Sequence, residues 1–250
     1  MDLRADGAAL AVWEKWQDAR AGARYAGPSR WRTPRAALRD PMLVERILER
    51  YGARPSMKPI LDAPCGAGRL RGVLERRGMR WVGLDASASM LREARSGPQP
   101  ASLVRALAGR LPFKDDSFDV VVCCRLLHHL HDEDEVEAVV GELVRVSARM
   151  VIASFWDSAS LHALRRRVGL RRSEGPSGRR AVSKRVLRRV FDAAGAEVVE
   201  FEHSFRFVSQ QAFAVALKRA PVEQRARVLV PSTRLFEIDV GGAPGSLGQA

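Results

Sequence analysis

The sequence predicts an α/β fold, in which helices cover both faces of a largely parallel central sheet. Short apolar runs alternate with amphipathic helical segments along most of the chain, and this alternation is typical of parallel sheets. The run FDVVVCC at residues 118–124 is almost continuously apolar, as in strands that are buried on both faces. The chain has 250 residues, 46% of them hydrophobic and 28% charged, which suffices for a buried core of this kind.

The first element of this pattern is a predicted helix over residues 40–51. Asp40 is placed to cap its N-terminus, Pro41 fits its first position, and Gly52 ends it. Apolar residues recur within it at the spacing of one helical face. Upstream, residues 8–20 show a weaker pattern of the same kind.

From residue 58 onward, strands and helices alternate. The predicted strands are residues 58–63, 80–86, 118–124, 149–156, 196–202 and 213–219. The predicted helices are residues 68–78, 87–95, 133–147 and 184–195, with Ser87 and Ser183 as N-caps of the second and the fourth. This order of elements indicates a doubly wound sheet.

The three cysteines, Cys65, Cys123 and Cys124, are odd in number and show no C-x-x-C spacing. This pattern argues against a disulfide framework and against a zinc site, so we expect no bound metal. Cys123 and Cys124 end an apolar run and are expected to be core thiols. No window approaches the roughly 18 apolar residues of a membrane span, and the N-terminus lacks the apolar stretch of a signal peptide. The composition favours a cytoplasmic protein.

The net charge of +13 is concentrated in one segment. Residues 165–189 contain ten arginines, Lys184 and a single acid, Glu174, which amounts to a net charge of +10. Arginine clusters bind phosphate on a lipid headgroup, a nucleotide sugar or RNA, but the same composition is also typical of a solvated loop. The segment lacks the interleaved aromatic residues on which bases stack, and this weakens the RNA interpretation.

Three segments carry residues suited to a ligand site where the carboxyl ends of strands meet helix N-termini. Residues 62–68 (DAPCGAG) place glycines after a strand, so that the backbone can approach a ligand and N–H groups can bind an anionic group. Asp85 ends the next strand and is suited to accept both hydroxyls of a ribose. The third segment, residues 111–130 (LPFKDDSFDVVVCCRLLHHL), joins a turn to the buried strand and then to a pair of histidines.

Taken together, these motifs resemble the class I S-adenosylmethionine-dependent methyltransferases, of the small-molecule type with an LPF-x-D-x-SFD signature. The resemblance covers about residues 40–220. It implies a Rossmann-like, doubly wound and mostly parallel sheet of seven strands with helices on both faces, and S-adenosylmethionine as the cofactor. A nicotinamide cofactor fits less well, because Arg71 stands at the third glycine position of G-x-G-x-x-G.

The resemblance also implies site residues. The glycine-containing loop would hold the methionine part of the cofactor, Asp85 its ribose hydroxyls, and Met90 would pack toward the adenine. The full set of implied cofactor-binding residues is Asp62, Ala63, Pro64, Cys65, Gly66, Gly68, Asp85, Ala86, Met90, Leu107, Ala108 and Cys124. Pro64 replaces the first glycine of the family loop, at a position that tolerates a fixed φ and needs no N–H. Leu107 replaces an acid that reads the adenine amino group, so either adenine recognition rests on apolar contact and backbone groups or the affinity for the cofactor is lower.

Methyl transfer requires proximity, alignment and, for a weakly acidic acceptor, a base. His128 and His129 follow the buried strand, where the active-site cleft of the resembling family opens, and both are candidate catalytic bases. His129 is preferred, because many members of that family have a histidine there; the alternative is that both histidines cap or pack this segment. Candidate substrate-binding residues are Tyr25, Trp31 and Trp156, for which core packing is the alternative.

We expect an N-terminal cap at residues 1–39, a methyltransferase domain at residues 40–220 with a basic insert at 157–182, and a C-terminal tail at 221–250. The leading hypothesis is an S-adenosylmethionine-dependent methyltransferase that acts on an O, N or C atom of a small-molecule or lipid-like acceptor, and the arginines favour an anionic one. The alternatives are an RNA methyltransferase that uses residues 165–189, and a non-catalytic protein that binds the cofactor or a partner. The acceptor atom and the oligomeric state stay open.

Overall fold

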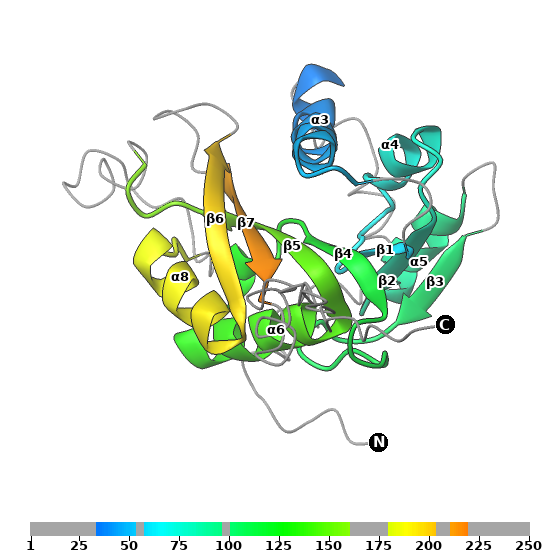
Figure 1. Cartoon of the computed structure of the whole chain (residues 1–250). Coiled ribbons are helices and arrows are strands. Elements are labelled where there is room, and N and C mark those ends of the chain that lie inside the picture. The colour runs from blue at the N-terminus through cyan, green and yellow to red at the C-terminus, as the bar shows by residue number, and fades with distance from the viewer. Residues whose placement is uncertain (1–33, 54–57, 97–100, 161–179, 204–210, 220–250) are drawn as a thin grey trace, which may run out of the picture. The chain divides into compact units, whose positions relative to one another are not determined.

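The computed structural model describes residues 34–53, 58–96, 101–160, 180–203 and 211–219 (Figure 1). Its strands are β1 (Ile60–Asp62), β2 (Trp81–Asp85), β3 (Ser102–Arg105), β4 (Phe118–Cys123), β5 (Ser147–Trp156), β6 (Ala196–His203) and β7 (Gln211–Lys218). Its helices are α3 (Pro34–Arg50), α4 (Arg71–Arg76), α5 (Ala88–Arg95), α6 (Glu133–Val146) and α8 (Lys184–Ala193), with a short 3-10 helix, η2 (Leu127–His129).

The strands form a seven-stranded sheet in the order β3-β2-β1-β4-β5-β7-β6. Strands β1 to β5 run parallel to one another, whereas β7 is antiparallel to both β5 and β6. The direction in which successive strands are added reverses between β1 and β4. In open α/β sheets, ligands bind outside the carboxyl ends of the strands at such a reversal. This topology confirms the predicted doubly wound, mostly parallel sheet.

The sheet is buried on both faces. In β4, Val121 and Cys123 belong to an apolar core with residues of α6 and α8, whereas Val120 and Val122 belong to a second core with residues of α3 and α4. Strand geometry explains this division, because successive side chains point to opposite faces. Figure 1 shows the corresponding layers, with α6 and α8 on one side of the sheet and α3 and α4 on the other. Burial on two faces therefore accounts for the continuous apolar run at residues 118–124.

Local signals placed several helix ends correctly. The Ser87 side chain accepts a hydrogen bond from the Met90 N–H (3.3 Å) at the start of α5, and Ser183 accepts one from the Val186 N–H (3.2 Å) at the start of α8. Gly52 follows α3 with a φ of +68°, which glycine adopts at no steric cost. The two predicted serine caps and the predicted glycine stop are confirmed.

The start of α3 differs from the prediction. The helix begins at Pro34, so that Asp40 and Pro41 both lie inside it, and the prediction of Asp40 as the N-cap was wrong. An Asp-Pro pair ordinarily marks a first turn, because proline has no N–H to donate within a helix. Here Asp40 is instead buried and ion-paired to other segments of the chain. These long-range contacts explain why the local signal was misleading.

Strand β3 was missed by the sequence pattern. It is short, it lies at the edge of the sheet next to β2, and its residues are exposed or half-buried. An edge strand has one neighbour and needs no continuous apolar run, so its sequence carries little hydrophobic signal.

The acidic turn at residues 111–119 (LPFKDDSFD) lies at the amino-terminal edge of the sheet, because it leads into β4. Its Asp116 carboxylate pairs with Lys218 at the end of the antiparallel strand β7. Lys218 also donates to the Ser147 carbonyl oxygen (2.9 Å) at the start of β5. The predicted ligand residues at the ends of β1 and β2 lie at the opposite edge. The acids of this turn therefore support the fold and stand apart from those ligand residues.

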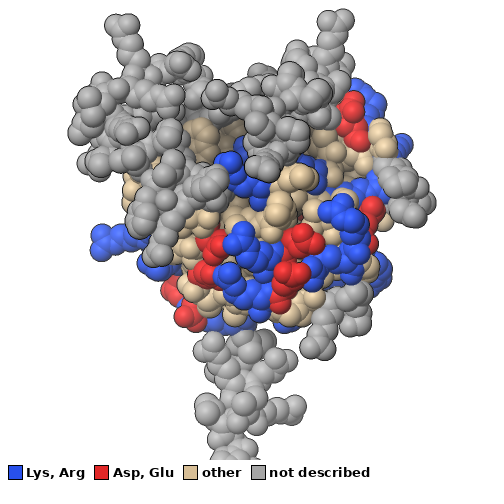
Figure 2. Space-filling model, turned by 90° about the horizontal axis from the view of Figure 1, so that it is seen from above, with Lys and Arg blue, Asp and Glu red and all other residues tan. Residues whose placement is uncertain are grey.

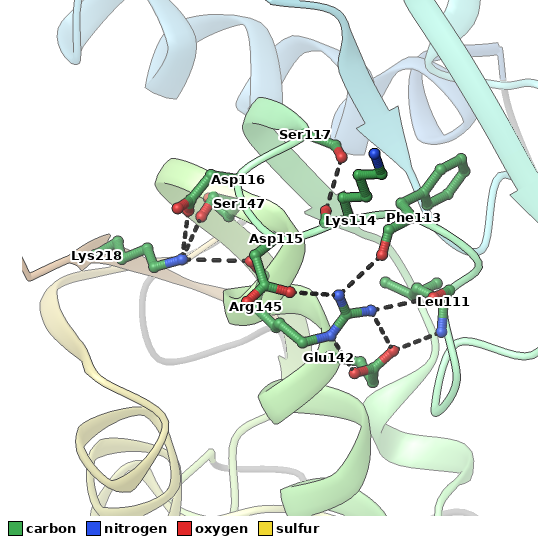
Figure 3. Close-up of polar contacts among 10 residues, drawn as sticks. All are labelled: Leu111, Phe113, Lys114, Asp115, Asp116, Ser117, Glu142, Arg145, Ser147 and Lys218. Atoms are coloured by element: carbon green, nitrogen blue, oxygen red, sulfur yellow. Dashed lines mark hydrogen bonds and ion pairs between the residues drawn. The ribbon is translucent and has the colours of Figure 1, made fainter.

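Arg145 of α6 holds this turn in place (Figure 3). Its guanidinium donates to two carbonyl oxygens of the turn and to two carboxylates, namely Leu111 O (3.1 Å), Phe113 O (2.8 Å), Asp115 Oδ1 (2.7 Å) and Glu142 Oε1 (2.6 Å). Glu142 in turn accepts the Leu111 N–H (2.6 Å). The hydrogen bond from Arg145 is the main reason why the pKa of Glu142 lies below its ordinary value. A single side chain thus anchors the turn from Leu111 to Asp115.

We expect Arg145→Ala to lower the free energy of unfolding by about 2–3 kcal/mol, because the turn loses its charged donor and Glu142 loses its partner. Urea denaturation measures the change. Arg76→Ala, at an exposed position on α4, is the control and should stay within about 0.5 kcal/mol of the parent protein. A loss for Arg145→Ala no larger than that of the control would contradict this role.

Candidate functional site

The segment between β1 and α4 forms a tight loop at the carboxyl edge of the sheet. Its Ala63 N–H donates to the Val122 carbonyl oxygen of β4 (2.8 Å), and its Cys65 N–H donates to the Leu84 carbonyl oxygen of β2 (2.8 Å). The Ala63–Pro64 peptide bond is cis. The loop is therefore hydrogen-bonded to the strands on both sides of β1.

Both predicted loop glycines have backbone conformations that favour glycine. Gly66 has a φ of +55° and Gly68 a φ of +75°. A Cβ atom at Gly68 would lie 3.3 Å from the Cα and the Cβ of Ala94 on α5, closer than most such contacts. The path of the loop against α5 thus depends on the absence of a side chain at this position.

Asp85, at the end of β2, connects the loop to the start of α5. Its Oδ2 accepts the Gly66 N–H (2.9 Å) and its Oδ1 accepts the Ser87 N–H (2.8 Å). Burial raises the pKa of Asp85, and these N–H groups counteract the rise in part. Two motifs that the sequence pointed to separately, the glycine loop and Asp85, are therefore in direct contact.

Asp62, at the end of β1, is buried with an incomplete set of hydrogen bonds. Its Oδ2 lies 3.4 Å from the Trp81 Nε1, and its Oδ1 has no partner among the residues that the structure describes. The indole can lie here because Gly83 has no Cβ, which would be 2.5 Å from the Trp81 ring. Burial raises the pKa of Asp62 to about 8, and Trp81 and the Arg69 charge lower it only in part. A buried carboxyl oxygen without a partner is unfavourable, so this position suits a donor from a ligand.

The other implied cofactor-binding residues follow Asp85, between β2 and α5, within α5, and in the turn after β3. Met90 is buried in the first turn of α5, and the Ala86 carbonyl oxygen accepts a hydrogen bond from Arg105 Nε (3.1 Å). Leu107 and Ala108 are half-buried in the turn after β3. Their roles toward a cofactor stay predictions.

The three cysteines are free thiols. Cys123 is fully buried in the core, as predicted, whereas Cys124 is half-buried with its Sγ 3.4 Å from Arg69 Nη2. Burial raises the pKa of all three thiols, that of Cys124 to about 12. They are therefore neutral near pH 7, which disfavours a nucleophilic role.

The two histidines follow β4 in η2, and the structure brings them together with Trp156 from the end of β5. The His128 ring is buried and stacks on Trp156, with ring centroids 4.6 Å apart and planes 4° apart. The His129 ring lies 4.4 Å from that of His128 and is half-buried. His128 thus has a packing role, whereas His129 keeps partial access to solvent.

A buried ion cluster that sequence reasoning missed joins three segments at this edge. Asp40 Oδ2 of α3 accepts hydrogen bonds from Arg69 Nη2 (2.8 Å) and Arg125 Nε (2.7 Å). Arg69 belongs to the segment after the glycine loop, and Arg125 follows β4. Asp40 is 29 and 85 residues away from them along the chain, so no local pattern indicates these contacts.

A second cluster that sequence reasoning missed surrounds Asp157 after β5. Its carboxylate lies 3.2 Å from Lys184 Nζ and 3.1 Å from His203 Nε2, and it accepts the Ala159 N–H (2.9 Å). Burial acts to raise the pKa of Asp157, but these hydrogen bonds outweigh it and hold the pKa below its ordinary value. The cluster ties the ends of β5 and β6 to the start of α8.

The described part of the basic segment is partly neutralised within the protein. Arg189 of α8 pairs with Glu133 and Glu137 at the start of α6, and Arg180 lies 4.0 Å from Glu133. On the face shown in Figure 2, basic and acidic side chains are interspersed. These pairs leave less positive charge for an external anion than the composition of the segment suggests.

Some predicted features lie outside the described residues, namely Tyr25, Trp31 and residues 161–179 of the basic segment. Within the described part of the chain, no helix combines the length and apolar character that a membrane crossing requires. The same residues contain no group of three or more His, Cys, Asp or Glu side chains arranged to hold a metal ion.

We expect Gly68→Ala to lower the free energy of unfolding by about 1–3 kcal/mol, because alanine is strained at positive φ and would press on Ala94. Gly141→Ala is the matched control: it lies inside α6 with no atom within 4 Å of the added Cβ, and it should stabilise the protein by about 0.5–1 kcal/mol. Urea denaturation of both variants measures these changes, and equal effects would contradict the packing described for the loop.

Comparison with known proteins shows what part of this chain resembles. Residues 61–150 match a family described as "Methyltransferase domain". The matched residues include the glycine loop, Asp85, the acidic turn and the histidine pair.

Sequence relatives match over part of the chain. A demethylmenaquinone methyltransferase from Thermobifida fusca is 35% identical over 101 residues, which are 38% of this chain and 43% of the relative. A ubiquinone biosynthesis O-methyltransferase from Serratia proteamaculans is 31% identical over 111 residues, which are 42% of this chain and 46% of the relative. The chain thus spans less than half the length of these two relatives.

Solved structures share the fold. The crystal structure of magnesium protoporphyrin IX methyltransferase from Synechocystis PCC 6803 with bound SAH matches with a TM-score of 0.67 at 20% identity, over 84% of this chain and 99% of that one. A SAM-dependent methyltransferase from Archaeoglobus fulgidus matches with a TM-score of 0.54 at 17% identity, over 71% of this chain and 94% of that one. The predicted resemblance is confirmed: residues 61–150 match a methyltransferase domain family, and the chain shares its fold with S-adenosylmethionine-dependent methyltransferases of known structure.

Proposed function

We propose that the chain is an S-adenosylmethionine-dependent methyltransferase that acts on an O, N or C atom of a small-molecule or lipid-like acceptor. The observation that carries the proposal is the arrangement at the ends of β1 and β2. There the Gly66 N–H donates to Asp85 (2.9 Å). Asp62 ends the neighbouring strand, and its buried Oδ1 has no hydrogen-bond partner among the described residues. The acceptor class is supported by relatives named for quinone and porphyrin substrates, which are largely apolar ring compounds.

The described residues fit the chemical groups of this cofactor. Asp62 Oδ1 would accept a hydrogen bond from the ammonium of the methionine part, and Asp85 would accept from the ribose hydroxyls with its remaining lone pairs. When bound, the cofactor would supply a methyl group on a sulfonium sulfur, and an acceptor atom would bond to the methyl carbon as the sulfur leaves in line. The loop between β1 and α4, which is hydrogen-bonded to β2 and β4, would hold that group in one position, and positioning of this kind is the main contribution a protein makes to such a displacement.

On the acceptor side, we propose that His129 removes the proton of a weakly acidic acceptor. Its partial exposure supports this role, because a base must reach the acceptor, and an imidazole ring can accept a proton from a neighbouring group. The buried His128 ring, stacked on Trp156, would keep this wall of the site in place. Arginines of the basic insert would favour an acceptor with an anionic group.

Binding of S-adenosylmethionine, the methyl donor, tests the proposal directly. Calorimetry should show S-adenosylmethionine binding to the parent protein, and Asp85→Ala should weaken it about 10- to 100-fold, because a charged hydrogen-bond acceptor is lost. Glu137→Ala, an exposed acid on α6, is the control and should bind as the parent does. No binding by the parent protein, or equal binding by the parent and Asp85→Ala, would overturn the proposal.

Transfer of a labelled methyl group separates the competing functions. The protein is incubated with methyl-labelled cofactor and a fractionated cell extract. Label in the small-molecule or lipid fraction supports the proposal, whereas label in RNA supports the RNA alternative. Binding without any transfer to any fraction would identify a non-catalytic binding protein.

The protonation of Asp62 predicts how donor binding depends on pH. Because the pKa of Asp62 is raised to about 8, the empty protein carries a neutral carboxyl group below that pH. An arriving ammonium favours the carboxylate, so binding should release about one proton per donor at pH 6.5, and affinity should rise up to about tenfold per pH unit as pH 8 is approached. Calorimetry in two buffers of different ionisation enthalpy counts the proton.

Two comparisons isolate this effect. Asp62→Asn should bind the donor without releasing a proton, and it should fold as the parent does because the replaced group is already neutral. Methylthioadenosine, which lacks the amino-acid part of the donor, should bind the parent protein without proton release. Release that persists in Asp62→Asn would assign the proton to another group.

A further inference from the structure

Asp40 lies between two segments of the proposed site. One is the loop between β1 and α4 (residues 63–70), called the donor loop because it would hold the methyl donor, and the other is the segment after β4 (residues 124–129), on the acceptor side. It comes from α3, and its exposed fraction is 1%. A single oxygen, Oδ2, accepts hydrogen bonds from Arg69 (2.8 Å) and from Arg125 (2.7 Å). Arg69 directly follows Gly68 of the donor loop, and Arg125 precedes the histidine-bearing helix η2.

Each arginine also contacts other residues of its own surroundings. The contact with Asp40 can therefore influence where the backbone next to each arginine lies. Arg69 Nη2 lies 3.4 Å from the Cys124 Sγ at the end of β4. The Arg125 N–H donates to the Ser154 Oγ of β5 (2.6 Å), and its φ of +66° is uncommon for a residue other than glycine. A charge-assisted hydrogen bond to each guanidinium therefore couples two backbone segments through one carboxylate.

Attachment of α3 alone does not require this cluster. The apolar face of the helix is buried in the core through Leu43, Val44, Ile47 and Leu48. The exposed residues Glu49 and Arg50 also form ion pairs, with Arg77 next to α4 and with Glu200 of β6. A buried carboxylate shared between two guanidiniums is costly to desolvate, and α3 has other anchors, so its place beside both loops suggests a separate role.

We propose that Asp40 is a positioning residue that holds the donor loop and the segment after β4 in a fixed relation to each other. This inference rests on the proposed function, because it assigns those two segments to the donor and to the acceptor. Asp40 acts through Arg69 and Arg125 and itself touches neither reacting molecule.

Binding of S-adenosylhomocysteine, measured by calorimetry, tests the inference without catalysis. Asp40→Asn should weaken binding on the order of tenfold, because the amide cannot satisfy two guanidiniums as the carboxylate does. Arg125→Gln should weaken it to a similar extent, although Arg125 lies on the acceptor side. The double variant Asp40→Asn/Arg125→Gln should bind no more weakly than Asp40→Asn alone, since both changes break the same connection.

Glu49→Gln is the matched control, because it removes an ion pair of the same helix at an exposed position remote from the cluster; it should bind as the parent does. Thermal melts show which variants are folded, and a purely structural role would change melting without changing the affinity of the folded protein. If Asp40→Asn does not fold, the affinity of Arg125→Gln for S-adenosylhomocysteine by itself tests the inference.

Parental affinity in Arg125→Gln would overturn the inference. Multiplied losses in the double variant would also overturn it, because they would indicate that Arg125 contacts the donor independently. No binding of S-adenosylhomocysteine by the parent protein would overturn the proposed function itself.

Discussion

The buried Asp85 carboxylate holds the donor loop against the start of α5 by one hydrogen bond to each, and the rest of the proposed site is arranged around that loop. The register of parallel strands places the carboxylate, since Asp62 of β1 pairs with Gly83 of β2, two residues before Asp85. The loop turns at positive φ, which directs its N–H groups away from ordinary strand partners. Asp85 satisfies one of them, and it also satisfies an N–H at the start of α5. One buried carboxylate thus links strand order to loop shape.

The two edges of the sheet differ in how their acidic residues are hydrogen-bonded. At the amino edge, Arg145 and Lys218 bind the acids and carbonyl groups of the acidic turn, in an arrangement that serves stability (Figure 3). At the carboxyl edge, Asp62 is more deeply buried than those acids, yet one of its oxygens has no partner among the described residues. A protein selected for stability alone would pair this group or replace it. Such exceptions concentrate at functional sites, and this contrast favours the carboxyl edge as the ligand side.

How well each element could be predicted depends on the range of the forces that form it. The buried strands and the caps at Ser87 and Ser183 were predictable, because burial on two faces and a capping hydroxyl both leave a local pattern. Edge strand β3 leaves almost none, since half of its surroundings are solvent. The acidic turn has a conspicuous sequence, but its place at the amino edge and its contacts with Arg145 became evident only in the folded chain.

The sequence by itself determined the buried strands and the helices between them, the glycine loop, the acid twenty residues after Cys65, and through them the resemblance to methyltransferases. These features are short-range, because each depends on residues within one turn or one strand. Only the tertiary structure decided that Asp40 lies inside a helix and joins Arg69 to Arg125, and that Asp62 has a buried oxygen without a partner among the described residues. The reason is physical: whether a polar group is paired depends on groups that folding brings from distant parts of the chain, and such contacts leave no local pattern in the sequence.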